Sequence, residues 1–176
     1  MSPARAEAPR AAARQAGLGL LEFVLAAIVI SILIVVFFSR VVRLSEAVER
    51  TAVQQTVNNL DSVIKLKWLT HLVRNEQDAL RAMVGSNPMR LLQEPPVTYL
   101  GELDRPDPAA IPPQRWYFDT RQRLLVYRVA NPRAIEGGAG DPPRIRFRVE
   151  AVRDGEGKIQ GIEMRPLEPY QWRKAS

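Results

Sequence analysis

One carboxylate stands inside the most apolar stretch of this chain. Glu22 lies near the start of residues 18–39, LGLLEFVLAAIVISILIVVFFS, and no other charged residue follows it before Arg40. An ionised side chain at the centre of a bilayer costs roughly 2.5–3.5 kcal/mol on insertion scales, so an acid in such a stretch is a functional candidate. The rest of the sequence offers little chemistry, because His71 is the only histidine and there is no cysteine.

The sequence contains no motif for catalysis or for metal binding. No group of histidines and carboxylates has metal-ligand spacing. No glycine-rich phosphate loop and no strand-turn-helix nucleophile motif occurs. We therefore predict no catalytic residue, no metal site and no cofactor, and we expect that the protein is not an enzyme.

The segment around Glu22 has the length of a membrane span. About 20 apolar residues, rising 1.5 Å each, cross a hydrocarbon core roughly 30 Å thick. Residues 1–17 precede this span and contain Arg5, Arg10 and Arg14, with no apolar stretch of their own. They therefore differ from an ordinary secretory signal, which has an apolar core before its cleavage site.

The order of these parts resembles the prepilin and pseudopilin signature of the type IV pilin-like family. The chain has a basic leader, Gly17, four mostly apolar residues, Glu22 and then a continuous span. In that family a membrane peptidase cuts after the glycine and N-methylates the new first residue. The resemblance implies cleavage between Gly17 and Leu18, N-methylation of Leu18, and a role for Glu22 in assembly or register. Leu18 and Gly19 depart from the usual Phe and Thr or Ser.

Cleavage at this place would also make electrostatic sense. It would leave a cationic amine on Leu18, one helical turn from the carboxylate of Glu22. The positive end of the helix dipole favours an acid there by roughly 0.3–1 kcal/mol. In a filament, the acid of one subunit could neutralise the amine of a neighbour and so set the axial register.

The resemblance also implies partners and a location. The partners would be a prepilin peptidase, other pilin or pseudopilin subunits bound through the N-terminal helix, and an inner-membrane assembly platform. The chain would cross the inner membrane once, with residues 40–176 in the periplasm, and then enter a type IV pilus or a type II secretion pseudopilus. The Leu-Gly start, the absence of cysteine and the Arg-rich domain favour a minor subunit. The alternative is a single-span, signal-anchored periplasmic scaffold or sensor that is not built into a filament.

A helical period continues after the span. Apolar residues recur at spacings of three to five between Val41 and Leu72, with polar residues between them. This pattern predicts one helix from about residue 18 to the low 70s, followed by an extension or a second helix over 76–84. We therefore assign residues 40–84 to an amphipathic continuation and 85–114, which are rich in proline, to a loop.

Residues 115–176 read as a small antiparallel sheet. Predicted strands are 115–119 and 123–129, which form a hairpin, then 144–152 and 158–165, with a loop over 133–143. The sequence thus predicts an α+β fold in which a long N-terminal helix packs on a C-terminal antiparallel sheet. The hairpin WYFD–LVYR also resembles minor pilin-like proteins of mannose-sensitive haemagglutinin pili.

One strand of this sheet has a basic face. Arg144, Arg146 and Arg148 alternate with apolar residues, and Arg121, Arg123, Arg128 and Arg133 are expected nearby. Three interpretations stay open: a solvated outer face, contact with acidic surfaces of neighbouring subunits, or contact with a nucleic-acid backbone beside Tyr117 or Tyr127. The formal net charge of +6 is compatible with each of them.

Overall fold

A computed structural model describes residues 12–173 of the chain, and the side chains of 12–18 and 42–44 are left out of the description. The first eleven residues of the predicted leader, with Arg5 and Arg10, lie outside the described residues. The chain divides into two compact units, one ending at Ser45 and the other beginning at Glu46.

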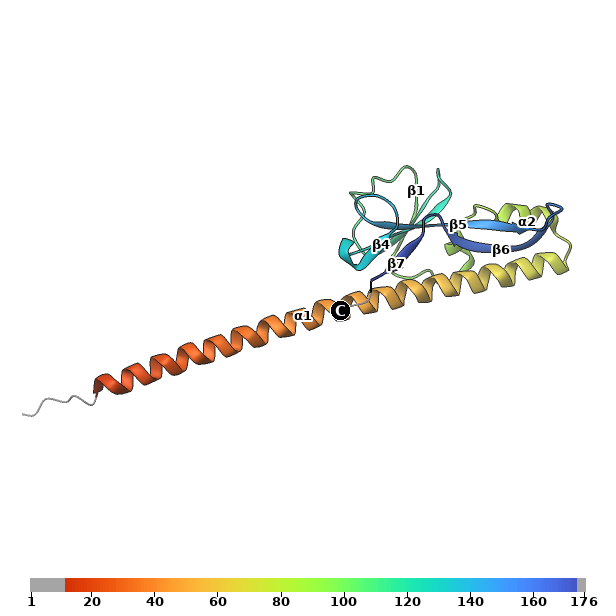
Figure 1. Cartoon of the computed structure of the whole chain (residues 1–176). Coiled ribbons are helices and arrows are strands. Elements are labelled where there is room, and N and C mark those ends of the chain that lie inside the picture. The colour runs from red at the N-terminus through yellow and green to blue at the C-terminus, as the bar shows by residue number, and fades with distance from the viewer. Residues whose placement is uncertain (1–11, 174–176) are drawn as a thin grey trace, which may run out of the picture. The chain divides into compact units, whose positions relative to one another are not determined.

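Helix α1 (Ala12–Val73) is the longest element and contributes to both units (Figure 1). It begins before the expected start near residue 18, because Ala12, Ala13, Arg14, Gln15 and Ala16 are all strong helix formers. No proline interrupts it, and its end in the low 70s is as predicted.

Helix α1 ends in a Schellman motif, so residues 76–84 start a second helix, which is one of the two options that the sequence left open. Asn75 adopts a positive φ of 55°, which asparagine tolerates better than most residues. The N–H groups of Asn75 and Glu76 donate to the carbonyls of Leu72 (3.1 Å) and His71 (2.9 Å). The His71 ring also contacts the Glu76 carboxylate across this turn, with 2.5 Å between Nδ1 and Oε2. A separate short helix, α2 (Gln77–Met83), follows the turn.

The second unit contains a five-stranded sheet in the order β1-β2-β3-β5-β6. Its strands are β1 (Tyr99–Leu103), β2 (Arg115–Asp119), β3 (Leu124–Arg128), β5 (Arg144–Arg153) and β6 (Ile159–Pro166). β2, β3, β5 and β6 pair antiparallel, whereas β1 pairs parallel with β2. The sheet is therefore mixed, and the prediction of a purely antiparallel sheet was wrong at this edge.

Strand β1 also corrects the prediction that residues 85–114 form a loop. The Trp116 N–H donates to Thr98 (2.9 Å) and the Thr120 N–H to Leu103 (3.0 Å), so this segment is held to β2 by its backbone. The same segment begins with a short 3₁₀ helix, Pro88–Leu91, whose N-cap Asn87 accepts a hydrogen bond from Met89 N–H. This turn, with a cap residue before proline, was expected from the sequence.

One strand of a second, two-stranded sheet lies within the segment predicted as a loop over 133–143, and the other lies near the C-terminal end of the described residues. The 3₁₀ turn Pro132–Ala134 leads into β4 (Ile135–Gly137), which pairs antiparallel with β7 (Tyr170–Trp172). Both strands are three residues long, too short to show a period in the sequence.

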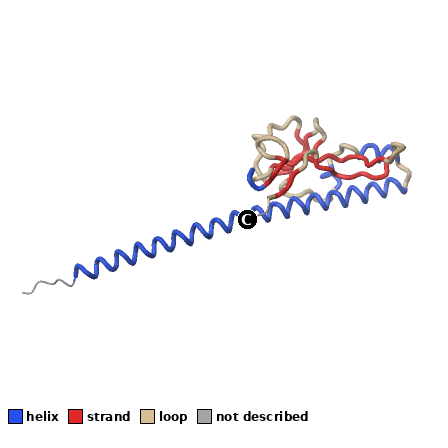
Figure 2. Tube along the Cα trace, viewed as in Figure 1, coloured by secondary structure: helices blue, strands red, loops and turns tan. Residues whose placement is uncertain are grey.

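The hydrophobic core of the second unit joins residues 46–73 of α1 to one face of the sheet. Val53, Leu60 and Ile64 of the helix form one buried cluster with side chains of the inner sheet face, among them Trp116, Leu125, Tyr127, Ile145, Phe147 and Val149. Figure 2 shows the strands gathered along this part of the helix. The fold of this unit is thus α+β, with a helix packed on a mostly antiparallel sheet.

The opposite, outer face of the sheet carries a smaller cluster. Ile111, from the chain before β2, packs there on Tyr117, Leu124 and Val126, with Leu103 at its edge. Residues 104–114 therefore cover part of the outer face, and this same face carries Arg115, Arg128, Arg144, Arg146 and Arg148.

Candidate functional site

The apolar part of α1 has no packing partner among the described residues of its own unit. Its large side chains expose between 48% (Val24) and 74% (Phe23) of their surface over residues 20–38. The helix from Gly19 is long and apolar enough to cross a membrane, and none of its most apolar window is buried. It is a candidate for a single membrane span.

Glu22 lies on the exposed surface of this helix. The backbone of Gly17 and Leu18 is helical, so Leu18 and Glu22 are one turn apart, as the sequence predicted. Such a pair, four residues apart, lies on one side of a helix. The Glu22 carboxylate therefore lies one turn from the backbone nitrogen of residue 18, on a surface that is otherwise apolar.

The three predicted arginines of β5 share the outer face of the sheet but differ in their surroundings. Arg146 forms a bidentate ion pair with Glu168, with 3.2 Å from Nε to Oε2. Arg148 lies directly opposite Arg165 of β6, which has its own partner in Glu163. Arg144, Arg146 and Arg148 are all partly buried.

Arg144 instead belongs to a row that crosses three strands. Arg115 of β2 pairs in register with Arg128 of β3, and Arg128 pairs with Arg144 of β5. We call these three residues the arginine row. The expectation that Arg128 lies near Arg144 is confirmed, whereas Arg115 was not among the arginines expected there.

The arginine row is built into the protein rather than extended into solvent. Arg128 donates from Nη1 to the Ala109 carbonyl (3.3 Å), and Arg115 donates to the Val97 carbonyl (3.5 Å). Burial raises the pKa of the neighbouring Tyr117, and the positive charge of Arg144 lowers it to a smaller extent. The Nε atoms of Arg128 and Arg144 are buried and have no acceptor among the described residues.

The tyrosines expected beside a nucleic-acid backbone are not available for stacking. Tyr117 exposes 2% of its surface and Tyr127 4%. They also lie on opposite faces of the sheet, since Tyr127 belongs to the inner core and Tyr117 to the outer cluster. Single-stranded nucleic acids are commonly held by exposed aromatic side chains, and these two residues cannot supply them.

A second acid of α1 is buried, and nothing in the sequence indicated it. Glu49 exposes 5% of its surface. Its Oε1 accepts hydrogen bonds from the Tyr127 hydroxyl (3.0 Å) and from the Ala130 N–H (2.9 Å). Burial and the neighbouring carboxylate raise the pKa of Tyr127 well above its ordinary value. The neighbouring Glu46 accepts from the Asn131 amide (2.5 Å), so two acids fasten this turn of the helix to the chain after β3.

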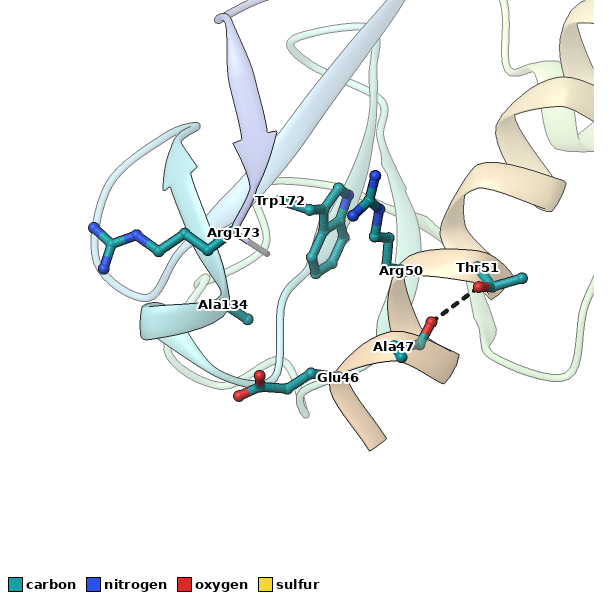
Figure 3. Close-up of a pocket in the computed structure, with 7 residues that line it drawn as sticks. All are labelled: Glu46, Ala47, Arg50, Thr51, Ala134, Trp172 and Arg173. Carbon is teal, nitrogen blue, oxygen red and sulfur yellow. Dashed lines mark hydrogen bonds between the residues drawn. The ribbon is translucent and has the colours of Figure 1, made fainter. Parts of the chain in front are cut away.

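A recess of about 520 Å³ lies next to these hydrogen bonds (Figure 3). It is lined by α1 and by the end of the small sheet, through Glu46, Ala47, Arg50, Thr51, Ala134, Trp172 and Arg173. The Trp172 indole N–H is buried there without an acceptor among the described residues. Within residues 12–173, no three His, Asp or Glu side chains are grouped to hold a metal ion.

Comparisons with family models, with curated protein sequences and with solved structures found no match.

Proposed function

We propose that this chain is the precursor of a minor pilin or pseudopilin. In this proposal a prepilin peptidase processes it in the inner membrane, and the mature chain joins a type IV pilus or a type II secretion pseudopilus. The observation that carries the proposal is Glu22, a single acid on a fully exposed apolar helix, one turn after Leu18. The basic leader before Gly17 supports the same assignment.

The exposed apolar helix supports assembly through neighbouring subunits. A surface of this kind is stable in lipid, and it is equally stable when it packs against other apolar helices in a filament. Subunits that associate head to tail through such helices form an open helical array. Glu22 would then neutralise the amine of a processed neighbour, and that pairing would select one register among many.

One observation favours the alternative of an uncleaved, signal-anchored scaffold or sensor. The helix runs without a break from Ala12 through Gly17 and Leu18, so the proposed cleavage site lies inside regular structure. A chain that keeps its leader would use the same helix as a simple anchor. The two proposals differ in the mass of the mature protein.

The deciding experiment is co-expression with a prepilin peptidase, followed by intact mass measurement and N-terminal sequencing. Processing predicts a mature chain that starts at N-methylated Leu18. Gly17→Leu should stop cleavage, whereas Gly19→Ala should not, because a Cβ at Gly19 meets nothing within 4 Å. A full-length product from the unaltered chain would favour the anchored scaffold.

The role of Glu22 is tested separately from cleavage. Glu22→Ala should leave processing intact but abolish incorporation into filaments, measured by recovery of the subunit in sheared filament fractions. Asp78→Ala is the matched control, since the side chain of Asp78 is fully exposed on α2 outside the apolar helix. Filaments that incorporate Glu22→Ala at the normal level would exclude a register role.

A further inference from the structure

The arginine row places three like charges side by side on one sheet face. Residues directly opposite each other on neighbouring strands have Cβ atoms about 4.5–5.5 Å apart, and like charges at such positions are destabilising. Arg115, Arg128 and Arg144 occupy three such positions in succession. None of them forms an ion pair with a carboxylate within residues 12–173. The fold therefore maintains a local excess of positive charge that its own side chains do not neutralise.

Other arginines of the same face are treated differently. Arg146 is held by Glu168 in a bidentate ion pair, and Arg165 is paired with Glu163. These pairs show that the outer face has carboxylates within reach of its strands. Arg148 of the same face also forms no ion pair among the described residues, but only Arg115, Arg128 and Arg144 stand opposite one another on three successive strands.

Two arginines of the row are also fixed in position and partly dehydrated. The chain over 104–114 covers the face beside them, and Arg128 is tied to Ala109 of that segment. The buried Nε atoms of Arg128 and Arg144 lack an acceptor among the described residues. A buried donor without an acceptor is costly, and a dehydrated guanidinium binds an anion more strongly than a solvated one.

We propose that the arginine row is a binding site for an oxyanion of the phosphate monoester type. A carboxylate has two oxygens and occupies one guanidinium fork, as Glu168 does on Arg146. A tetrahedral phosphate has further oxygens and can bridge forks from neighbouring strands, which lie about 4.7–4.9 Å apart. Its double negative charge also suits three adjacent cations better than the single charge of a diester does. This inference does not depend on the proposed filament function.

The test uses the full chain in a zwitterionic detergent, with inorganic phosphate as the probe. Phosphate should produce saturable shifts of the arginine Nε–H signals in ¹⁵N-labelled protein, at Arg128 and Arg144 but not at Arg165. Sodium chloride at equal ionic strength should produce none of these shifts. Dimethyl phosphate, a monoanionic diester, should bind at least about tenfold more weakly than phosphate does.

Matched variants separate a built site from diffuse attraction. Arg144→Gln should weaken phosphate binding at least about tenfold, because it removes a partly buried guanidinium that would pair with the bound phosphate. Arg165→Gln removes the same charge from the same sheet face and should change the affinity less than about twofold. If Arg144→Gln fails to fold, Arg128→Lys serves instead, since it keeps the charge and loses the fork.

Three outcomes would overturn the proposal. The first is the absence of saturable phosphate shifts at Arg128 and Arg144. The second is an equal loss of affinity in Arg165→Gln, which would indicate attraction by net charge alone. The third is dimethyl phosphate binding as tightly as phosphate, which would assign the face to phosphodiesters, such as those of a nucleic acid or a phospholipid.

Discussion

The two units of this chain use the same long helix in opposite ways. In the first unit the apolar side chains of α1 face outward, and Ile30 exposes 55% of its surface. In the second unit Ile64, on the same helix, is fully buried at 0% exposure. The sheet covers Ile64, whereas no described element of the first unit covers Ile30. Two isoleucines in the same helix thus have different surroundings. Ile64 is surrounded by the protein core, whereas Ile30 faces whatever lies outside the chain.

Two of the four acids of α1 show the opposite contrast. Glu22 lies exposed among apolar side chains, and Glu49 lies buried in the polar half of the helix. Glu49 accepts hydrogen bonds from Tyr127 and Ala130, so its surroundings were built within the chain. The proposed partner of Glu22, by comparison, comes from another molecule. The helix therefore carries one acid for folding and, in our proposal, one for assembly.

The largest expected effect is on stability, and it tests the contrast between the buried Ile64 and the exposed Ile30. Ile64→Ala should lower the free energy of unfolding by about 2–5 kcal/mol, because it leaves a cavity in the core. Ile30→Ala removes the same atoms from an exposed position and should change that free energy by no more than about 0.5 kcal/mol. Denaturant unfolding in detergent, followed by tryptophan fluorescence, measures both variants, since Trp68, Trp116 and Trp172 all lie in the second unit.

The reverse order of effects would mean that the first unit has a core of its own. A loss of stability in Ile30→Ala as large as that in Ile64→Ala would require the apolar helix to pack within the chain. The contrast between the two units would then be wrong, and the exposed helix would lose its value as evidence for a membrane or filament environment.

The second prediction concerns the buried acid. Glu49→Ala should cost about 1–3 kcal/mol, because the Tyr127 hydroxyl and the Ala130 N–H lose their shared acceptor inside the protein. Glu49→Gln is the matched control: both hydrogen bonds end on Oε1, and an amide oxygen there can accept them. We therefore expect Glu49→Gln to unfold closer to the unaltered protein, in the same fluorescence measurement. Equal losses in both variants would show that the charge, and not the acceptor, matters.

The sequence predicted correctly those strands whose pattern of apolar and polar residues is visible within the strand itself. The strand 115–119 was predicted with the bounds of β2, and the alternation over 144–152 predicted β5, because a half-buried strand repeats every two residues. Strand β1 was missed since prolines flank it and its pairing partner, β2, follows it by a long connection. The α+β class was predicted because the amphipathic helix and the sheet each have an apolar face that must be buried against another element.

The sites divide in the same way. The spacing of Gly17, Leu18 and Glu22 is local and could be read directly, although its function stays a proposal. The hairpin register, with Asp119 opposite Leu124, would have placed Arg115 opposite Arg128. Arg128 was expected near Arg144, but the register that sets them directly opposite each other depends on how β5 pairs with β3, which no local pattern shows. Glu49 looked like any polar residue of an amphipathic helix, since its partners lie about eighty residues away along the chain.

The smallest expected effect is a pH dependence of stability that arises in the second unit alone. The chain has four tyrosines, and all of them lie in the second unit. Burial raises the pKa of each of them above the ordinary value of 10.0, and for Tyr127 the carboxylate of Glu49 adds to this effect. The folded state therefore keeps its phenols protonated at a pH where the unfolded chain has begun to release the protons.

The sign of the pH dependence follows from this difference. A group that binds its proton more tightly in the folded state stabilises it fully below the unfolded pKa, and the contribution is lost as pH rises further. The free energy of unfolding should thus be constant with respect to these groups below pH 10 and fall above it, with a smaller slope in Tyr127→Phe. Denaturant titrations at several alkaline pH values, with tyrosinate absorbance recorded in parallel, measure this slope. The helix of the first unit has no tyrosine, so any alkaline loss of its helicity that precedes the fluorescence change would contradict this assignment.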